Sequence, residues 1–148
     1  MTSIDQLLSK SSDHYRFHGV RAQTLSQLIS QSENSEILLW GTDEDEHITE
    51  DFEEAEYVQG EGFLYVTDIR NIQMSYSEFC DDGGLVLVLE KSVEKPFEFE
   101  HPTDRRQFII KVQEWKVVGG LRPVEVDEDG DVVEEEAFSL EDILSENF

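Results

Sequence analysis

Residues 85–90 read LVLVLE, five apolar residues followed by one glutamate. Successive side chains of a β-strand point to opposite faces, so both faces of a strand with this sequence would be apolar. Strands that are apolar on both faces are typical of the interior of a covered sheet. The run therefore predicts a central strand, and its neighbours in sequence indicate what surrounds it.

Several flanking segments are rich in aromatic and β-branched residues, or alternate between polar and apolar residues. GFLYVTDI (62–69) and IQMSYSEF (72–79) predict strands from their composition. FCDDGG (79–84) predicts the turn into LVLVLE, and FEFEH (97–101) alternates so that one face is apolar. These segments indicate a sheet built around residues 85–90.

The segment HPTDRRQFIIKVQEWKVVGG (101–120) fits two structures. As a helix it would begin with Thr103 as N-cap and end at Gly119, with apolar side chains spaced along one face. As a strand it would place Phe108 and Ile110 on one face. We prefer the helix, because its start and stop signals agree with each other.

The C-terminal part predicts a hairpin and a short helix. VEVDEDGDVV (124–133) has an Asp-Gly dipeptide at its centre, which is a strong signal for a tight turn between two strands. In SLEDILSENF (139–148), Ser139 precedes Asp142 by three residues, which is the spacing of a helix-capping pair. The apolar residues that follow predict an amphipathic helix.

The N-terminal part predicts helices followed by a strand. SIDQLLSKS (3–11) has Ser3 in the N-cap position, and a second helix is predicted to begin at Thr24. The polar sequence SENS (32–35) ends this helical part, and ILLW (37–40) predicts a buried strand.

Together these elements predict an α+β fold, with a mostly antiparallel sheet, N-terminal helices and one or two C-terminal helices. A chain of 148 residues is long enough for one domain with a buried core. We expect a single domain that contains a helical lead-in (1–35), a sheet-rich core (36–133) and an acidic C-terminal helix (134–148).

The negative charge of the chain is concentrated in two blocks. Of 35 acidic residues, ten lie in Asp43–Glu61 and eleven in Glu125–Glu146, and neither block contains Lys or Arg. The other 107 residues hold 14 acids and 11 bases. A salt-adapted protein would spread its acids over the whole surface, and solubilising acidic tails lie at chain ends without apolar residues. Both blocks contain apolar residues, so we expect them to be part of the folded structure.

Several classes of protein are disfavoured by the sequence. MTSIDQLLSK at the N-terminus has no secretory signal, and no apolar run approaches the roughly 20 residues that span a bilayer. Cys80 is the single cysteine, so no intrachain disulfide or thiol-based metal site is expected, and a cytoplasmic location is predicted. The anionic surface disfavours direct binding of nucleic acid or of anionic lipid, because both require Lys and Arg.

Two patterns resemble metal sites, and each has a simpler interpretation. The oxygens from Glu125 to Glu136 are spaced as in an EF-hand loop, but Glu replaces Asp at the first position and Pro123 damages the entering helix, so a hairpin is preferred. His47 stands three residues from Glu44 and three from Glu50, but no converging helices are visible, so a solvated acidic loop is preferred. No metal, cofactor or catalytic residue is predicted, and Cys80 beside two aspartates is not an activated nucleophile.

GEGFLYVTDIR (60–70) and PFEFEHPTDRRQFIIKVQEW (96–115) together resemble the half of pleckstrin-homology and GRAM-type domains that leads from strands into the final helix. Members of these families that bind phosphoinositides use a basic first hairpin. The segment before Gly62 is acidic here, so the resemblance implies a scaffold for binding proteins and not for binding lipid.

The preferred function is a non-enzymatic binding protein that masks a basic surface, such as that of a nuclease toxin or another nucleic-acid-handling enzyme. Immunity proteins and DNA mimics act in this way. Acidic residues would attract the partner, and aromatic residues among them would anchor it. The predicted partner-binding residues are Asp43, Glu44, Asp45, Glu46, Glu50, Asp51, Phe52, Glu53, Glu54, Glu56, Tyr57, Asp127, Asp129 and Asp131.

Two other functions are compatible with the sequence. In an adaptor or chaperone on a pleckstrin-homology-like scaffold, the C-terminal helix would dock in a partner's groove through Leu140, Ile143 and Leu144; alternatively this helix packs on its own sheet. An enzyme would need a pocket that the sequence does not reveal, lined by the aromatic residues Tyr65, Tyr76 and Trp115.

Overall fold

Strand β3 (Leu85–Lys91) lies inside the larger of two antiparallel sheets, as predicted. The structure is a computed structural model that describes residues 4–30, 63–80, 83–100 and 106–145. β3 pairs with β1 (Tyr15–Val20) on one side and with β6 (Trp115–Val126) on the other. The side chains of residues 85–89 are all 0% exposed, so both faces of this strand are covered.

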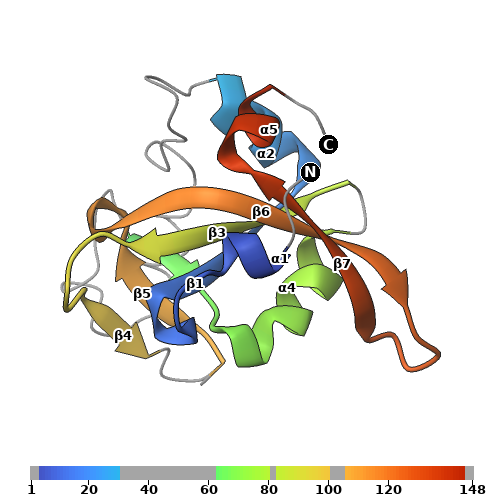
Figure 1. The fold of residues 1–148 in the computed structure, drawn as a ribbon, viewed down its shortest axis with the longest axis horizontal. Coiled ribbons are helices and arrows are strands. Elements are labelled where there is room, and N and C mark those ends of the chain that lie inside the picture. Colours follow the sequence, from blue (N-terminus) through green and yellow to red (C-terminus); the bar gives the residue numbers. More distant parts are fainter. Residues whose placement is uncertain (1–3, 31–62, 81–82, 101–105, 146–148) are drawn as a thin grey trace.

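The larger sheet has four strands in the order β1-β3-β6-β7, where β7 is Val132–Ser139. The smaller sheet has three strands in the order β2-β5-β4: β2 is Phe63–Val66, β5 is Phe108–Lys111 and β4 is Glu98–Glu100. Every pairing is antiparallel. The predicted α+β class is therefore confirmed, with two antiparallel sheets in place of one (Figure 1).

The two sheets are joined at two places. Phe17 of β1 and Thr67, just after β2, exchange backbone hydrogen bonds of 2.9 and 2.8 Å. The chain also passes directly from β5 into β6 through the 3₁₀ turn η4 (Val112–Glu114). Because one continuous segment contributes to both sheets, their relative position is fixed by short connections.

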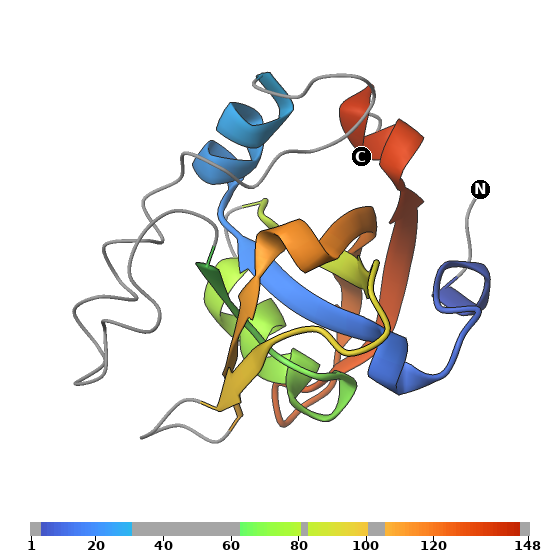
Figure 2. The same cartoon turned by 90° about the vertical axis from the view of Figure 1, so that its left-hand side faces the viewer.

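Helices cover both faces of β3. Its leucines join a core cluster with α2 (Ala22–Ser30), α5 (Leu140–Leu144) and part of the smaller sheet. Its valines join a second cluster with α4 (Ile72–Phe79), and α1 (Ile4–Leu7) packs against that cluster. Figures 1 and 2 show α2 and α5 on one side of the larger sheet and α4 on the other.

The strand predicted for IQMSYSEF (72–79) is wrong, because this segment is helix α4. It follows the 3₁₀ turn η3 (Ile69–Asn71) and buries Ile72, Ser75 and Tyr76, a spacing of three and four residues that belongs to one helical face. The alternation of Ile72 and Tyr76 with polar residues also fits a strand, so the local pattern did not distinguish the two. GFLYVTDI forms the shorter strand β2, and Ile69 begins η3.

The preferred helix at 101–120 is also wrong in the part that the structure describes, where β5, η4 and β6 succeed one another. Phe108 and Ile110 face the same core cluster, as the strand alternative predicts. Gly119 does not end a helix. It lies in β6, where a Cβ would stand 2.5 Å from Leu7 Cδ1 and 2.5 Å from the Phe138 carbonyl oxygen, so a close approach of α1 and β7 requires glycine there.

This correction removes the main support for the resemblance to pleckstrin-homology and GRAM-type domains. The resemblance placed the start of their final helix within residues 96–115. The described part of that segment contains β4, β5 and the first residue of β6, joined to β6 by one 3₁₀ turn. We therefore derive no function from that scaffold.

The N-terminal residues are not a purely helical lead-in. α1 is only four residues long, the 3₁₀ turn η1 (Ser12–His14) follows it, and β1 then forms one edge of the larger sheet. α2 begins at Ala22, two residues before the predicted start. The predicted N-cap at Ser3 and the predicted strand at 37–40 lie outside the described residues.

The predicted hairpin and C-terminal helix are confirmed, although β7 extends to Ser139 and the helix occupies only Leu140–Leu144. The Ser139 hydroxyl accepts a hydrogen bond from the Asp142 backbone N–H, and the Asp142 side chain accepts one from the Ser139 N–H. Ile143 is 0% exposed, and Leu140 and Leu144 pack against the same cluster. The helix therefore packs on its own sheet, and its apolar residues do not face outward as anchors for a partner.

We expect Ile143→Ala to lower the free energy of unfolding by about 2–5 kcal/mol, because it leaves a cavity between α5 and the sheet. Glu141→Ala, at an exposed position of the same helix, is the matched control and should change it by less than about 0.5 kcal/mol. Urea denaturation followed by circular dichroism measures both. Equal effects of the two substitutions would show that α5 does not pack as described.

Candidate functional site

The structure describes only part of the predicted binding surface. Asp127, Asp129 and Asp131 lie at the tip of the β6–β7 hairpin. Eleven predicted residues lie outside the described residues, so their role stays a prediction: Asp43, Glu44, Asp45, Glu46, Glu50, Asp51, Phe52, Glu53, Glu54, Glu56 and Tyr57. The metal-ligand spacing around His47 lies outside them as well.

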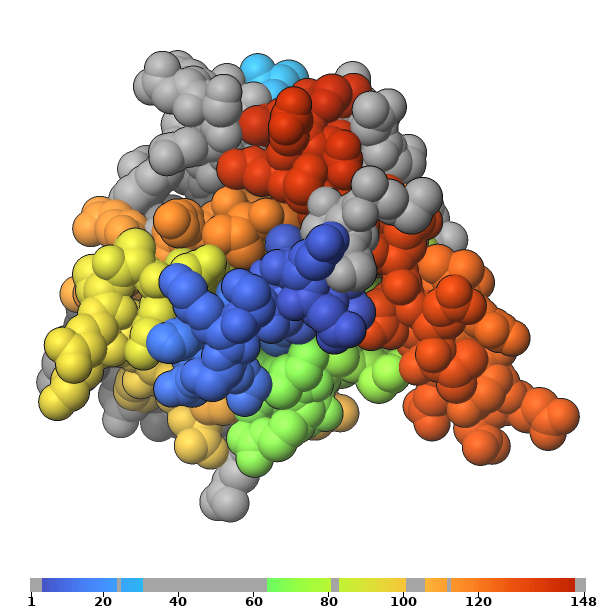
Figure 3. All heavy atoms as spheres, viewed as in Figure 1, coloured from blue at the N-terminus to red at the C-terminus, as the bar shows by residue number. Residues whose placement is uncertain are grey.

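The β6–β7 hairpin extends beyond the four-stranded sheet. β6 pairs with β3 only as far as Leu121, whereas it pairs with β7 as far as Val126. Residues 122–136 therefore form a two-stranded extension, which we call the acidic ribbon, and Figures 1 and 3 show it projecting from the body of the molecule. It holds eight carboxylates and one cation, Arg122. Pro123 is tolerated because only one neighbouring strand pairs with this part of β6.

Two bulges distort the acidic ribbon. Between the pairs Pro123–Glu135 and Glu125–Glu134, β6 contains the extra residue Val124. Between Glu125–Glu134 and the last pair of the ribbon, β7 contains the extra residue Val133. Bulges bend a strand and redirect side chains. Val124 is 56% exposed and Val133 is 58% exposed, so both present apolar surface among the carboxylates.

Two glutamates face each other across the ribbon. Glu125 and Glu134 are direct cross-strand partners, and both are exposed. Like charges in directly opposite positions of a sheet destabilise it. Arg122 pairs with Glu136 in the register, but its guanidinium lies over the Phe138 ring, 5.5 Å from the centroid. Among the described residues no ion pair includes a carboxylate of the acidic ribbon, so the repulsion is not offset by a salt bridge there.

The tip of the ribbon is a defined turn. The Asp127 carboxylate accepts hydrogen bonds from the backbone N–H groups of Asp129 (3.0 Å) and Asp131 (2.9 Å). Gly130 has a φ of +88°, a conformation that favours glycine. Asp127 thus stabilises the turn, while the side chains of Asp129 and Asp131 are exposed at the tip.

Helix α4 holds the ribbon at the last pair before its tip. The Gln73 amide donates to the Val132 carbonyl oxygen (3.1 Å) and accepts from the Val132 N–H (2.8 Å). Tyr76, three residues later, is buried, and its hydroxyl has no hydrogen-bond partner among the described residues. Burial raises the pKa of Tyr76 well above its ordinary value, and the nearby Glu135 carboxylate raises it further. An isolated two-stranded hairpin is marginally stable, so these contacts help to fix the ribbon.

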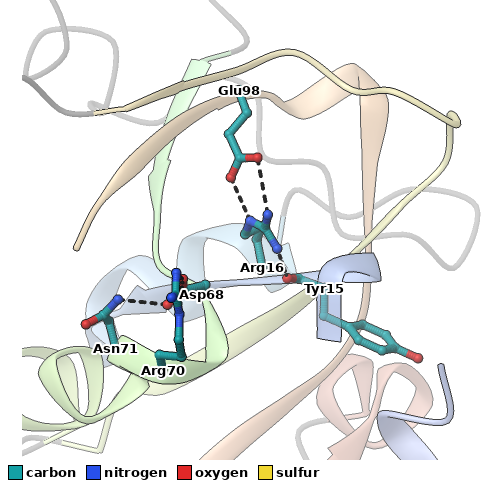
Figure 4. A network of polar contacts seen from close by, with 6 residues as sticks. All are labelled: Tyr15, Arg16, Asp68, Arg70, Asn71 and Glu98. Carbon is teal, nitrogen blue, oxygen red and sulfur yellow. Dashed lines mark hydrogen bonds and ion pairs between the residues drawn. The ribbon is translucent and has the colours of Figure 1, made fainter. Parts of the chain in front are cut away.

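A second polar cluster connects the two sheets, and Figure 4 shows its members. Arg16 of β1 donates to both carboxylate oxygens of Glu98 in β4, at 2.7 and 3.2 Å. Its guanidinium also lies 5.8 Å from the ring centroids of Phe108 and Trp115. Because Arg16 and Glu98 neutralise each other and join β1 to β4, this pair has a structural role.

Asp68 is the buried acid of the same cluster. Burial by itself would raise the pKa of Asp68, but hydrogen bonds from Arg70 (2.7 Å) and Asn71 (2.8 Å), together with the charges of Arg70 and Arg16, outweigh burial and lower it. A carboxyl group held ionised by such donors is not suited to act as a general acid or base near neutral pH.

The aromatic residues proposed for an enzyme pocket do not converge. Tyr65 packs with Ile109, Tyr76 belongs to the cluster beside α4, and Trp115 belongs to the cluster beneath α2 and α5. Within the described ranges, no group of three or more His, Cys, Asp or Glu side chains is arranged to hold a metal ion. No helix in the described part of the chain is long and apolar enough to cross a membrane.

Comparison with protein-family models, with curated proteins and with solved structures gives no significant match to this chain. The candidate site therefore rests on its own geometry. The apolar residues of the ribbon were not among the predicted anchors, which were Phe52 and Tyr57. The alternation of valine and glutamate at residues 124–126 was the signal in the sequence. It shows that apolar and acidic side chains share the hairpin, but it does not show that the hairpin leaves the sheet.

We expect Asp68→Asn to lower the free energy of unfolding at neutral pH by about 1–3 kcal/mol, because it replaces a charged acceptor of two side-chain donors. The pKa of Asp68 is lowered by folding, so the carboxylate stabilises the protein above its unfolded pKa, and this contribution is lost as the pH falls below about 4. Urea denaturation between neutral pH and pH 3 should therefore show a smaller loss of stability in the variant. A pH dependence as steep as that of the wild type would contradict this role.

We expect Glu134→Gln to raise the free energy of unfolding by about 0.2–1 kcal/mol at low ionic strength, because it removes one of two opposed like charges. Added salt should reduce the difference, since it screens exposed charges. Glu128→Gln, at the tip, removes the same charge without a directly opposed glutamate and is the matched control. A destabilised Glu134→Gln variant would mean that Glu134 makes a favourable contact in the free protein.

Proposed function

We propose that this chain is a non-enzymatic binding protein that covers a basic surface of a nuclease or of another nucleic-acid-handling protein. The observation that supports this most is the opposed pair Glu125 and Glu134 on a projecting, anchored ribbon. The pair destabilises the free fold and lacks an ion-pair partner among the described residues. A cationic partner would relieve this repulsion on binding, so the arrangement favours a complex over the free protein.

The acidic ribbon concentrates negative charge along one narrow element, as nucleic acid does. Five residues of β6, Arg122–Val126, span about 17 Å at about 3.4 Å per residue. This paired part carries four carboxylates, or roughly one negative charge per 4 Å, and the tip adds four more; duplex DNA carries one per ~1.7 Å of its axis. A groove lined with Lys and Arg for nucleic acid would attract the ribbon for the same electrostatic reason.

Attraction alone does not provide a stable complex, because exposed charges mainly accelerate association and select the partner. Contact area must come from groups that leave water when the complex forms. Val124, Val126 and Val133 are 56%, 53% and 58% exposed and stand among the carboxylates, so they offer apolar contact at the centre of the charged surface. The first acidic block, with Phe52 and Tyr57, stays a predicted second part of this surface.

The adaptor alternative has lost both of its supports, since the resemblance required a helix where β5 and β6 lie and since α5 packs on its own core. No specific observation favours an enzyme. The binding protein is therefore the function that the described geometry supports best.

The proposal predicts inhibition that depends on the ribbon. The assay uses the nuclease activity that a cation exchanger retains from an extract of the organism that encodes this chain. We expect the wild-type chain to inhibit cleavage of DNA or RNA at low salt and to lose potency as salt is added. A variant with Glu125, Glu134 and Glu136 all changed to Gln should be weaker by about tenfold or more, because it loses three charges of the binding surface.

A charge-matched control separates the ribbon from net charge. Changing Asp13 to Asn, and Glu78 and Glu94 to Gln, removes three exposed acids outside the ribbon. This control should inhibit as well as the wild type. Equal potency of the ribbon variant and the wild type, or an equal loss in the control, would refute the proposed role of the ribbon.

A further inference from the structure

Strand β7 is an edge strand of the larger sheet. It pairs with β6 on one side, and no described strand lies on its other side. An edge strand presents unpaired backbone N–H and C=O groups, to which another extended chain can add. In the acidic ribbon this edge runs beside three consecutive acids, Glu134, Glu135 and Glu136.

The register shows which backbone groups of β7 face the outer edge. In an antiparallel pair, residues alternate between exchanging two hydrogen bonds with the partner and pointing both groups away from it. Pro123 has no N–H, so Pro123 and Glu135 cannot exchange two bonds, and Glu135 directs its N–H and C=O outward. Ser139, four residues later in the same alternation, donates its N–H to the Asp142 side chain and not to β6, which agrees with this assignment.

One position of the outer edge is already occupied by a side chain. Val132 directs both its N–H and its C=O to the Gln73 amide of α4. A primary amide that donates to a backbone carbonyl and accepts from the N–H of the same residue reproduces the two bonds of a neighbouring strand. Gln73 is itself exposed, so a real strand could displace its amide without disturbing the core.

The charges on this edge select what can add to it. Two copies of this chain joined through β7 would bring their glutamate triplets together, and like charges on an edge oppose such pairing. An extended segment with Lys or Arg at every second residue would instead place cations beside these glutamates, and opposite charges favour strand pairing. Glu134 and Glu136 point to the same face, about 7 Å apart along the strand, which matches the spacing of alternate residues in the added chain.

We propose that a basic, extended segment of the partner adds to the outer edge of β7 as a further strand, and that it takes the place of the Gln73 amide at Val132. The inference rests on the proposed function, because it specifies how the acidic ribbon holds its partner. The backbone of the added segment would form hydrogen bonds with Val132 and Glu135. Its alternate cationic side chains would face Glu134 and Glu136. Exposed Val133 lies between Val132 and Glu134 and would contact apolar side chains of the added segment.

Three synthetic peptides of equal charge test the backbone part of the proposal. The first is TKVKVKT with blocked ends; the second and third carry N-methyl groups on the valines or on the lysines, which removes the N–H groups of one edge or of the other. We expect TKVKVKT to bind the full-length chain and one methylated peptide to bind about tenfold more weakly or worse, because backbone hydrogen bonds are lost. Binding of TKVKVKT should also slow hydrogen exchange of the Glu135 amide.

Substitution of Gln73 tests the displacement. Gln73→Ala removes the competing amide, so TKVKVKT should bind about threefold more tightly or better. Ser77→Ala, one turn further along the exposed side of α4, is the control and should not change the affinity. Affinities are measured by calorimetry at low salt, and the Val132 and Glu135 amide signals report whether the ribbon keeps its fold.

Two outcomes would overturn the inference. If the three peptides bind equally, without protection of the Glu135 amide, the attraction is electrostatic and no strand is added. If none binds, the edge does not accept a basic strand. In either case nuclease inhibition by the chain, and its loss in the ribbon variant, still decide the proposed function, because that assay does not depend on how the partner's backbone lies.

Discussion

The burial of β3 on both faces is the constraint on which the rest of the structure depends. Five consecutive apolar residues, 85–89, cannot be left half exposed, so each side of the larger sheet must be covered. α2, α5 and part of the smaller sheet cover the leucines, and α4 and α1 cover the valines. The short connection from β5 to β6 and the bridge from Phe17 to Thr67 keep the smaller sheet in place over that core.

The same constraint explains where the candidate binding surface lies. The covered part of β6 ends with β3, at Leu121, and beyond that point the strand has only β7 beside it. A two-stranded segment without a core of its own leaves both faces largely exposed. Exposed positions suit carboxylates better than large apolar residues. The stability of this segment comes from local contacts, namely the Asp127 turn, the Gln73 bonds to Val132 and the packing of Val132 against the cluster that contains Tyr76. Repulsion between Glu125 and Glu134 can persist there because it does not disturb the core.

The two polar clusters of the chain differ in the balance of charge. Around Arg16 and Asp68 each ion has an opposite charge within hydrogen-bonding distance, and the result joins one sheet to the other. In the acidic ribbon the described residues provide no ion pair for the carboxylates. Balanced ions contribute to the fold, whereas unbalanced ions on a projecting element are available to a partner. This difference, and not the number of acids, identifies the ribbon as the candidate site.

The sequence by itself determined the features that depend on neighbouring residues: the buried strand at 85–90, the Asp-Gly turn of the hairpin, the Ser139–Asp142 cap and the segregation of charge. Only the tertiary structure decided that residues 72–79 are a helix and that residues 108–126 are two strands joined by a 3₁₀ turn. Both local patterns fit helix and strand, and the choice depends on which faces the core covers. The tertiary structure also decided that β6 extends beyond the end of its pairing with β3, so that the acidic hairpin projects from the sheet. Pairing between residues far apart in the chain sets that length, and no local pattern contains it.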